Sequence, residues 1–372
     1  MWITDAAIVT ALGDTIEETW HHLLHFHTAI RPVDRFGVDG YRSDVAALVP
    51  GLKPDETGSR LPDLLKRLSR SMGSVPQDAW LITATTKGGI DMLGALEHKP
   101  SFSIRDMLPS VLDRIAADAF GLEKRGSTIS AACASSAIAV SHACALIHTE
   151  MTDVVLVCCA DLVTEFVFSG FSALGALSPT PCKPFDRDRN GLSLGEGAAA
   201  LVLMDAERAR TEGKRCLGQV LGWGGGSDAY HVTTPAPNAT GLIEAIGQAF
   251  VRAQMTPDAV FAVCAHGTGT VSNDAMELNA YTHFFSDAWP PVYSIKGAVG
   301  HTLGAAGGIE VALGLKTLSR QTAPPTVGLS HPVETALGRV TTQPAALKGD
   351  ILLTCNSGFG GINTAILLKR GI

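Results

Sequence analysis

The stretch that decides the fold is Ser127-Thr-Ile-Ser-Ala-Ala-Cys133-Ala-Ser-Ser-Ala137. A short apolar strand runs into small residues, and a helix of small and apolar residues is predicted over 135–149. A thiol at a helix start lies near unpaired backbone N–H groups and the positive end of the helix dipole, which both favour the thiolate. We therefore predict a nucleophilic cysteine with a lowered pKa at Cys133. The alternative for this residue taken alone is a buried structural cysteine.

Strand and helix patterns alternate on both sides of this stretch, which is typical of an α/β protein. The apolar run 153–159 predicts a central strand that is buried on both faces. Further strands are predicted at 6–10, 79–85, 198–204, 216–222, 260–265, 291–295, 351–356 and 364–369. Helices are predicted at 15–24, 206–213, 241–254, 274–285 and 305–320. We expect two tightly fused halves: residues 1–215, which carry the nucleophile, and residues 216–372, which carry two candidate histidines.

The composition of the 372 residues predicts a folded protein in the cytoplasm. Hydrophobic residues make up 46% and charged residues 17% of the chain, so a large core is expected. The net charge of −7 argues against nucleic acid or an anionic membrane as the main partner. Neither a signal peptide nor an apolar stretch of the ~20 residues that span a bilayer is apparent. The eight cysteines form no CxxC pair or zinc-like spacing, so we expect reduced thiols and no metal site.

Two later segments place a histidine just beyond a predicted strand. Cys264-Ala-His266-Gly-Thr-Gly-Thr270 bends at glycines, which suits an acid–base residue, although a lone loop histidine is more often a simple hydrogen-bonding group. Ser294-Ile-Lys296-Gly-Ala-Val-Gly-His301 adds a cation to such a loop. A buried lysine needs a partner, and Glu310 on the next helix is the candidate. The alternative is an exposed Lys–Glu pair of little energetic value.

A fourth segment, Asn356-Ser-Gly-Phe359-Gly-Gly361, breaks a strand close to the C-terminus. Glycines permit positive φ, so backbone N–H groups can converge there on an anion. Phe359 is expected to be a packing plug or a movable gate. Because loops at one end of an α/β sheet meet in a common crevice, the four segments predict one site for acyl transfer by a thiolate with imidazole assistance.

With these motifs the chain resembles the elongating β-ketoacyl-acyl carrier protein synthases of the Cys-His-His type. The resemblance covers nearly the whole chain, and it implies a thiolase-like fold of two similar halves stacked α-β-α-β-α, usually as a dimer. No cofactor is implied, because the phosphopantetheine arm arrives on the acyl carrier protein. The further matching motifs are Val9-Thr-Ala-Leu-Gly-Asp14, Gly170-Phe-Ser-Ala-Leu-Gly-Ala-Leu-Ser178, Lys183-Pro-Phe-Asp-Arg-Asp-Arg-Asn-Gly191, Gly195-Glu-Gly197 and Gly226-Ser-Asp-Ala-Tyr-His231.

The resemblance also implies a role for each site residue. Cys133 would accept the acyl chain, with its own backbone N–H and that of Phe359 as the oxyanion hole. His266 and His301 would assist decarboxylation of malonyl-acyl carrier protein and stabilise the enolate. This carbanion would then attack the thioester in a decarboxylative Claisen condensation and release a β-ketoacyl product.

Supporting roles are implied in the same way. Lys296, paired with Glu310, would hold the histidine network in place. Thr268 and Thr270 would bind the phosphopantetheine arm, and Phe359 would gate the acyl pocket.

The chain is shorter than its relatives mainly between Tyr41 and Ala79. Relatives place basic residues there to dock the acidic carrier protein, and the chain keeps four of them: Arg60, Lys66, Arg67 and Arg70. Lys66, Arg67 and Arg70 would share roughly one helix face. The alternative is an ordinary solvated face.

Several functional alternatives stay open. The chain could be the active or the chain-length-determining subunit of a heterodimer, in fatty acid or in polyketide or polyene synthesis. The segment Thr83-Ala-Thr-Thr-Lys-Gly-Gly89 resembles ketosynthases of polyene and polyketide clusters. A thiolase would use a second cysteine as base, and Cys355 is near the appropriate region. A cysteine protease would explain the presence of one cysteine and one histidine, but none of the other motifs.

Overall fold

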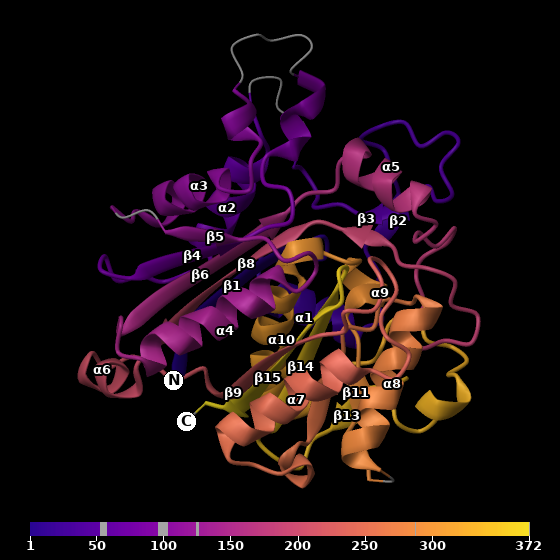
Figure 1. The fold of residues 1–372 in the computed structure, drawn as a ribbon. Coiled ribbons are helices and arrows are strands. Elements are labelled where there is room, and N and C mark those ends of the chain that lie inside the picture. Colours follow the sequence, from indigo (N-terminus) through magenta and orange to yellow (C-terminus); the bar gives the residue numbers. More distant parts are fainter. Residues whose placement is uncertain (53–57, 96–102, 124–125, 287, 372) are drawn as a thin grey trace.

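A ten-stranded sheet organises the protein (Figure 1). The computed structural model describes residues 1–52, 58–95, 103–123, 126–286 and 288–371. Across these ranges the strand order is β11-β10-β14-β15-β9-β1-β8-β6-β4-β5. The N-terminal five strands are β1 (Trp2–Thr10), β4 (Trp80–Ala84), β5 (Ser127–Ile129), β6 (Val154–Asp161) and β8 (Gly197–Met204). The C-terminal five are β9 (Gly218–Ser227), β10 (Ala262–Cys264), β11 (Val292–Tyr293), β14 (Ile351–Gly358) and β15 (Ile362–Arg370).

The two sets of five strands have the same topology. In the N-terminal set, β1–β8 and β8–β6 are antiparallel and β6–β4 and β4–β5 are parallel. In the C-terminal set, β9–β15 and β15–β14 are antiparallel and β14–β10 and β10–β11 are parallel. The two sets join where Trp2 and Ile3 of β1 pair with Gln219 and Gly218 of β9. The expected duplication into two similar halves is therefore visible in the strand order itself.

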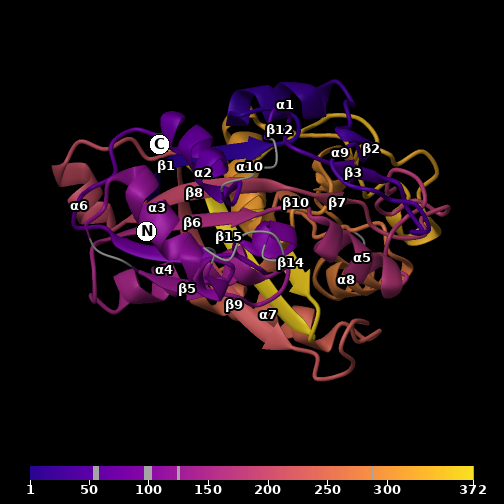
Figure 2. The same ribbon diagram turned by 90° about the horizontal axis from the view of Figure 1, so that it is seen from above.

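Helices complete the five layers. Helix α4 (Ser135–His148) contacts β4, β6 and β15, and α10 (Ala306–Arg320) contacts α4, β8 and β14, so both lie between the two strand sets. Helices α2 (Leu61–Arg70) and α3 (Val111–Phe120) cover the outer face of the N-terminal set. Helices α7 (Thr240–Ala253) and α8 (Val271–Phe285) lie on the C-terminal side (Figure 2). The α-β-α-β-α arrangement is confirmed.

Small residues allow the central helices to pack closely. A Cβ atom on Gly307 of α10 would lie 2.8 Å from Cβ of Ala137, and one on Gly308 would lie 2.5 Å from Sγ of Cys159. Helix α4 contains no Asp, Glu, Lys or Arg, so it can be buried without desolvating a full charge. The small-residue composition seen in the sequence thus permits the helix pair to pack between the two strand sets of the large sheet.

The predicted element boundaries need few corrections. Helix α8 begins at Val271 rather than at 274, because Oγ1 of Thr270 accepts a hydrogen bond from the N–H of Asn273 and caps the helix. A separate sheet of three short strands was not predicted: β2 (Ile30–Pro32), β3 (Val45–Ala47) and β7 (Leu194–Gly195). The remaining helices are α1 (Ile16–Leu24), α5 (Glu165–Ala173), α6 (Ala206–Thr211) and α9 (Lys296–Val299). Among the described residues, no helix has the length and apolar character needed to cross a membrane.

Candidate active site

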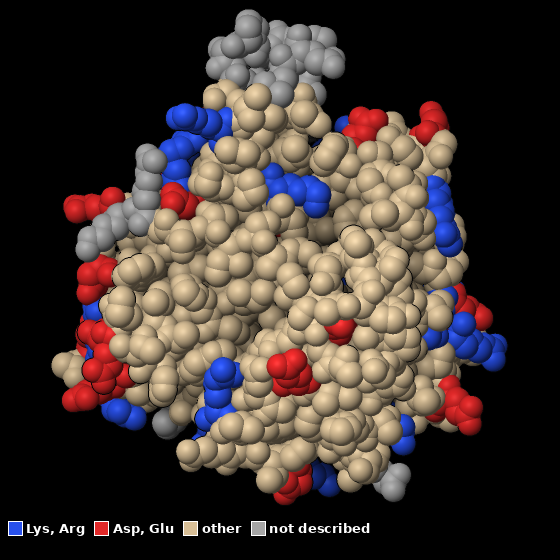
Figure 3. All heavy atoms as spheres, viewed as in Figure 1, with Lys and Arg blue, Asp and Glu red and all other residues tan. Residues whose placement is uncertain are grey.

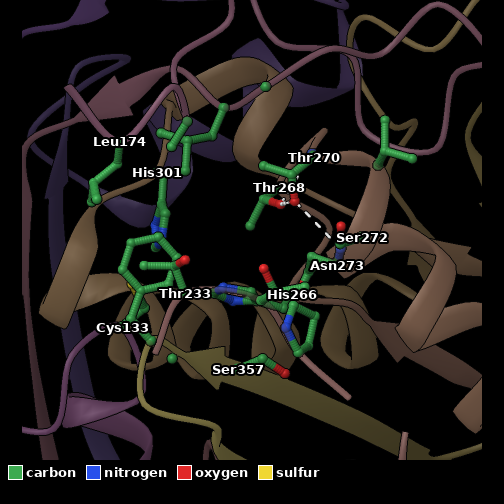
Figure 4. A pocket seen from close by; sticks show the side chains of 18 of the residues that line it. Cys133, Leu174, Thr233, His266, Thr268, Thr270, Ser272, Asn273, His301 and Ser357 are labelled. Atoms are coloured by element: carbon green, nitrogen blue, oxygen red, sulfur yellow. Dashed lines mark hydrogen bonds between the residues drawn. The ribbon is translucent and has the colours of Figure 1, made fainter. Parts of the chain in front are cut away.

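Four strand-end loops converge on one pocket, as the sequence predicts. Cys133 lies between β5 and α4, and His301 occupies the corresponding place between β11 and α10 in the other half. His266 follows β10 and Phe359 follows β14. The side chains of Cys133, His266 and His301 point into the same hollow (Figure 4), whose volume is about 480 Å³. Equivalent positions of two duplicated halves therefore supply the nucleophile and one of the two histidines.

The environment of Cys133 corrects one prediction. The residue is only 5% exposed, and this burial raises the pKa of its thiol to about 11. Nearby Lys296 and Lys87, and a hydrogen bond from the backbone N–H of Phe359, favour the thiolate but only partly offset the desolvation. The lowered pKa expected from the helix start is therefore wrong: the free thiol is protonated at neutral pH and loses its proton as it reacts.

The raised pKa predicts how alkylation of Cys133 depends on pH. For a thiol that titrates near pH 11, the thiolate fraction, and with it the iodoacetamide alkylation rate, should rise about tenfold per pH unit between pH 7 and 9. The modified cysteine is identified by peptide mass spectrometry, with Cys133→Ala as the control. A rate that is constant across this range would instead mean a preformed thiolate.

His266 is held as a neutral imidazole with a defined tautomer. Its Nδ1 lies 3.2 Å from Nζ of Lys296 and 3.4 Å from Nδ2 of Asn356, and both neighbours are donors. Nδ1 therefore accepts and Nε2 carries the proton. Burial, Lys296 and His301 keep the pKa of His266 well below its usual value.

His301 is also held as a neutral imidazole with a defined tautomer. Its Nδ1 accepts the backbone N–H of Leu303 at 3.3 Å, so its proton is also on Nε2. Burial, followed by Lys296 and Lys87, holds its pKa well below the usual value. The two imidazole rings are 5.1 Å apart between centroids and are perpendicular within a few degrees, at 85°. The pocket thus presents two uncharged N–H donors beside a thiol.

Lys296 links this pair to a buried ion pair. Its Nζ donates to Oε1 of Glu310 and, at 2.5 Å, to the backbone oxygen of His266, in addition to its contact with Nδ1 of that histidine. Asn356 donates to Oε2 of Glu310 at 2.6 Å. Lys296 is 1% exposed and Glu310 fully buried, so the exposed-pair alternative is excluded. All three ammonium hydrogens have acceptors, which fixes the orientation of the His266 ring.

Two buried carboxylates shape the His266 loop and were not assigned roles from the sequence. Glu277 accepts the backbone N–H groups of His266 and Gly267 at 2.7 and 2.6 Å. Asp274 accepts those of Thr268 and Gly269 at 3.1 and 3.2 Å. The available signal was their spacing of three residues on one helix behind a glycine-rich loop, which places both on the same helix face.

Thr268, Thr270 and Phe359 also line the pocket. The two threonine hydroxyls are 3.0 Å apart on one wall, and this hydrogen bond is drawn in Figure 4. Phe359 is half-buried, and its ring stacks on that of Phe171 with centroids 5.7 Å apart. The aromatic residue in the glycine turn thus packs against α5 beside the thiol.

The candidate docking residues do not form a single group. Arg60 is 5% exposed and forms ion pairs with Asp91 and Glu196, each at 3.3 Å, so it cannot belong to an exposed docking surface. Its place in the sequence gave no sign of these partners, which come from distant segments. On α2, Lys66 and Arg70 are exposed. Arg67 is half-buried and donates to the backbone oxygen of Pro50 and to Asp63.

Two further features bear on the alternatives and on metal binding. Cys355 is fully buried within β14 and, unlike Cys133, is not among the residues that line the pocket, so it is unsuited to act as the second cysteine of a thiolase. Among the described residues, ligand atoms of Asp186, Asp188 and His331 lie within 4.8 Å of one another. Both oxygens of Asp186 already accept backbone N–H groups, so this cluster serves to fix the Lys183–Gly191 motif.

Comparison with known proteins agrees with this geometry. Residues 77–209 match the family described as β-ketoacyl synthase, N-terminal domain, and residues 217–330 match the β-ketoacyl synthase, C-terminal domain. The 3-oxoacyl-[acyl-carrier-protein] synthase 2 of Synechocystis sp. is 28% identical over 99% of this chain and 97% of its own. The granaticin polyketide putative β-ketoacyl synthase 1 of Streptomyces violaceoruber is 30% identical over 99% and 97%.

Solved structures give the same result. The ishigamide ketosynthase/chain length factor superposes with a TM-score of 0.91 at 26% identity, covering 99% of this chain and 98% of that one. Fold and site together define a thiolase-like enzyme in which a cysteine and two histidines share one pocket, and a buried lysine behind them holds one of the histidines. The chain belongs to the β-ketoacyl synthase family.

Proposed function

We propose that the protein catalyses the decarboxylative condensation of an acyl group, held as a thioester on Cys133, with malonyl-acyl carrier protein. The observation that carries this proposal is the pairing of one buried thiol with two neutral imidazoles, both of which have their proton on Nε2. A hydrolase would need an imidazole free to take up a proton. Two donors instead suit the stabilisation of an oxygen anion.

In the first half-reaction, Sγ of Cys133 attacks the acyl thioester carbonyl. The backbone N–H groups of Cys133 and Phe359 hold the oxyanion, the bond between the carbonyl carbon and the carrier sulfur breaks, and the carrier leaves as a thiol with the proton that Sγ of Cys133 gives up. The backbone N–H of Phe359 favours the thiolate of Cys133, so it lies close to where the tetrahedral oxygen would form. This acyl group then stays in the pocket, which the stacked rings of Phe171 and Phe359 line.

In the second half-reaction, the malonyl thioester loses its carboxylate as CO₂, and the electron pair moves into the adjacent carbonyl. The resulting enolate oxygen accepts hydrogen bonds from Nε2 of His266 and His301. The carbanion attacks the thioester carbon, and Sγ of Cys133 departs. Lys296 acts as a positioning residue, because it holds the ring of His266 and contacts no reacting atom. Thr268 and Thr270 are the proposed contacts of the phosphopantetheine arm.

Substituting either histidine is expected to separate the two half-reactions. In His301→Ala and in His266→Ala, condensation should fall by about 10²–10³-fold, the usual cost of one lost oxyanion donor. Acylation of Cys133 should change by less than about tenfold, because its oxyanion hole is made of backbone N–H groups. Single-turnover acylation by mass spectrometry is compared with product formation from malonyl-acyl carrier protein. Equal losses in both steps would contradict these roles.

The proposed macromolecular partner is an acyl carrier protein, docked by exposed cations of α2. Lys66 and Arg70 are four residues apart and exposed, while the apolar face of α2 is buried. Reversing both charges with Lys66→Glu and Arg70→Glu should weaken carrier-protein binding, and the difference from wild type should shrink at high salt. The matched control is Lys348→Glu with Lys369→Glu, two exposed lysines of the other half. If the Lys66→Glu/Arg70→Glu variant binds the carrier protein as tightly as the control variant does, the exposed cations of α2 form an ordinary solvated face.

The protein is also proposed to act as a dimer in the cytoplasm, either with itself or with a related ketosynthase-like subunit. The edge strand β5 has a free side, and the neighbouring α4 has no charged residue. Charged side chains are sparse in the middle of the face that α4 shares (Figure 3). The presence of Cys133, His266, Lys296 and His301 favours the catalytic rather than the chain-length-determining subunit.

A further inference from the structure

Four histidines gather at the end of α1, far from the catalytic pocket in the sequence and outside its lining. We refer to His21, His22, His25 and His27 as the histidine cluster. The rings of His21 and His25 have centroids 4.3 Å apart and are tilted by 32°, a proximity expected for positions i and i+4 of a helix. The rings of His22 and His27 lie 4.9 Å apart, and their Nδ1 atoms are separated by 2.7 Å.

The backbone conformation after α1 brings the side chains of His22 and His27 together. The N–H of His27 donates to the oxygen of His22 and the N–H of Phe26 to that of Leu23, which is the hydrogen-bond pattern of a Schellman motif. In this motif the position of Phe26 is normally occupied by glycine. Phe26 has a φ of 58°, a left-handed backbone conformation that is energetically unfavourable for a bulky residue. The motif normally also brings two apolar side chains into contact, and here those two positions are His22 and His27.

The geometry points to a binding site for a divalent transition-metal ion, with Nδ1 of His22 and Nδ1 of His27 as its protein ligands. Imidazole nitrogens bind such ions at about 2.0–2.1 Å, so two ligands at a right angle are about 2.9 Å apart and two tetrahedral ligands about 3.3 Å. The observed 2.7 Å needs little adjustment for right-angled ligands, which favours Cu²⁺ or Ni²⁺ over tetrahedral Zn²⁺.

The surroundings leave room for the rest of the coordination shell. His22 and His27 line a cleft of about 770 Å³ that is separate from the catalytic pocket. The cleft is open to solvent, so water can complete the shell. All eight cysteines are buried, so they compete little for the ion. Binding would replace the proton that the two Nδ1 atoms now share.

The test uses the full chain without a histidine tag and titrates it with Ni²⁺ by calorimetry. Saturable binding of one ion is expected, and it should weaken by roughly tenfold or more in His22→Asn and in His27→Asn, since even an outer-sphere partner is worth about 10–100-fold. His283→Asn, which removes an exposed histidine on α8, is the control and should bind as wild type. Circular dichroism confirms that each variant is folded.

A second measurement identifies the ligands directly. The electron paramagnetic resonance spectrum of bound Cu²⁺ should show splitting from two imidazole nitrogens, and this pattern should be lost in His27→Asn but kept in His283→Asn. Failure of wild type to bind Ni²⁺ saturably, or equal affinity in His22→Asn, His27→Asn and wild type, would overturn the proposal. This site is independent of the proposed condensation.

Discussion

Cys133→Ala is expected to lose condensation by roughly 10⁴–10⁶-fold, the range seen when a catalytic nucleophile is removed. Without the thiol no acyl-enzyme forms, so the malonyl carbanion has no electrophile. The structure also predicts what survives. His266 and His301 keep their own partners, so release of CO₂ from malonyl-acyl carrier protein should continue. Product formation is followed by chromatography of the carrier-bound chains, and CO₂ by a coupled assay.

The control is Cys144→Ala. Cys144 is a fully buried thiol on α4 with no contact to the pocket, so its loss should leave condensation close to wild type. Residual chain elongation by Cys133→Ala would contradict the account. Simultaneous loss of condensation and CO₂ release would show instead that the substitution disrupts the histidine pair.

Lys296→Met is expected to destabilise the protein and stop condensation together. The substitution leaves the carboxylate of Glu310 buried without its cation, which costs about 3–5 kcal/mol in free energy of unfolding. It also removes the main donor to Nδ1 of His266, so the Nε2 proton is no longer fixed. Chemical unfolding measures the first effect, and product formation measures the second.

A double variant separates the two effects. In Lys296→Met with Glu310→Gln the buried charge disappears, and the amide oxygen of glutamine still accepts from Asn356. Most of the lost stability should return while condensation stays low, because the tautomer of His266 remains undefined. Recovery of condensation along with stability would mean that Lys296 only neutralises Glu310.

That the catalytic loops meet in one pocket could be predicted from the sequence, because the order and direction of the strands decide where these loops lie. Each of the loops containing Cys133, His266, Lys296 and Phe359 follows a strand, and parallel neighbours bring such loops to one edge. The α-β-α-β-α stacking followed from the resemblance, and the repeated strand order gives it a physical basis.

The remaining features depended on distant contacts. The pKa of Cys133 rises because the thiol is buried, and desolvation by segments remote in sequence exceeds the local effect of a helix start. Arg60 lies next to exposed cations in sequence, yet Glu196 and Asp91 bind it inside the protein. The spacing of Asp274 and Glu277 places both on one helix face, but their backbone partners in the His266 loop are defined only by the folded structure.

The central claim is that Cys133 holds the growing chain until a decarboxylating malonyl unit attacks it. The most direct test is intact-protein mass spectrometry after incubation with acyl-acyl carrier proteins of different chain lengths. A mass increase of one acyl group is expected on Cys133; it should be absent in Cys133→Ala and should be discharged when malonyl-acyl carrier protein is added. An adduct that forms on another residue, or one that malonyl-acyl carrier protein does not discharge, would contradict this claim.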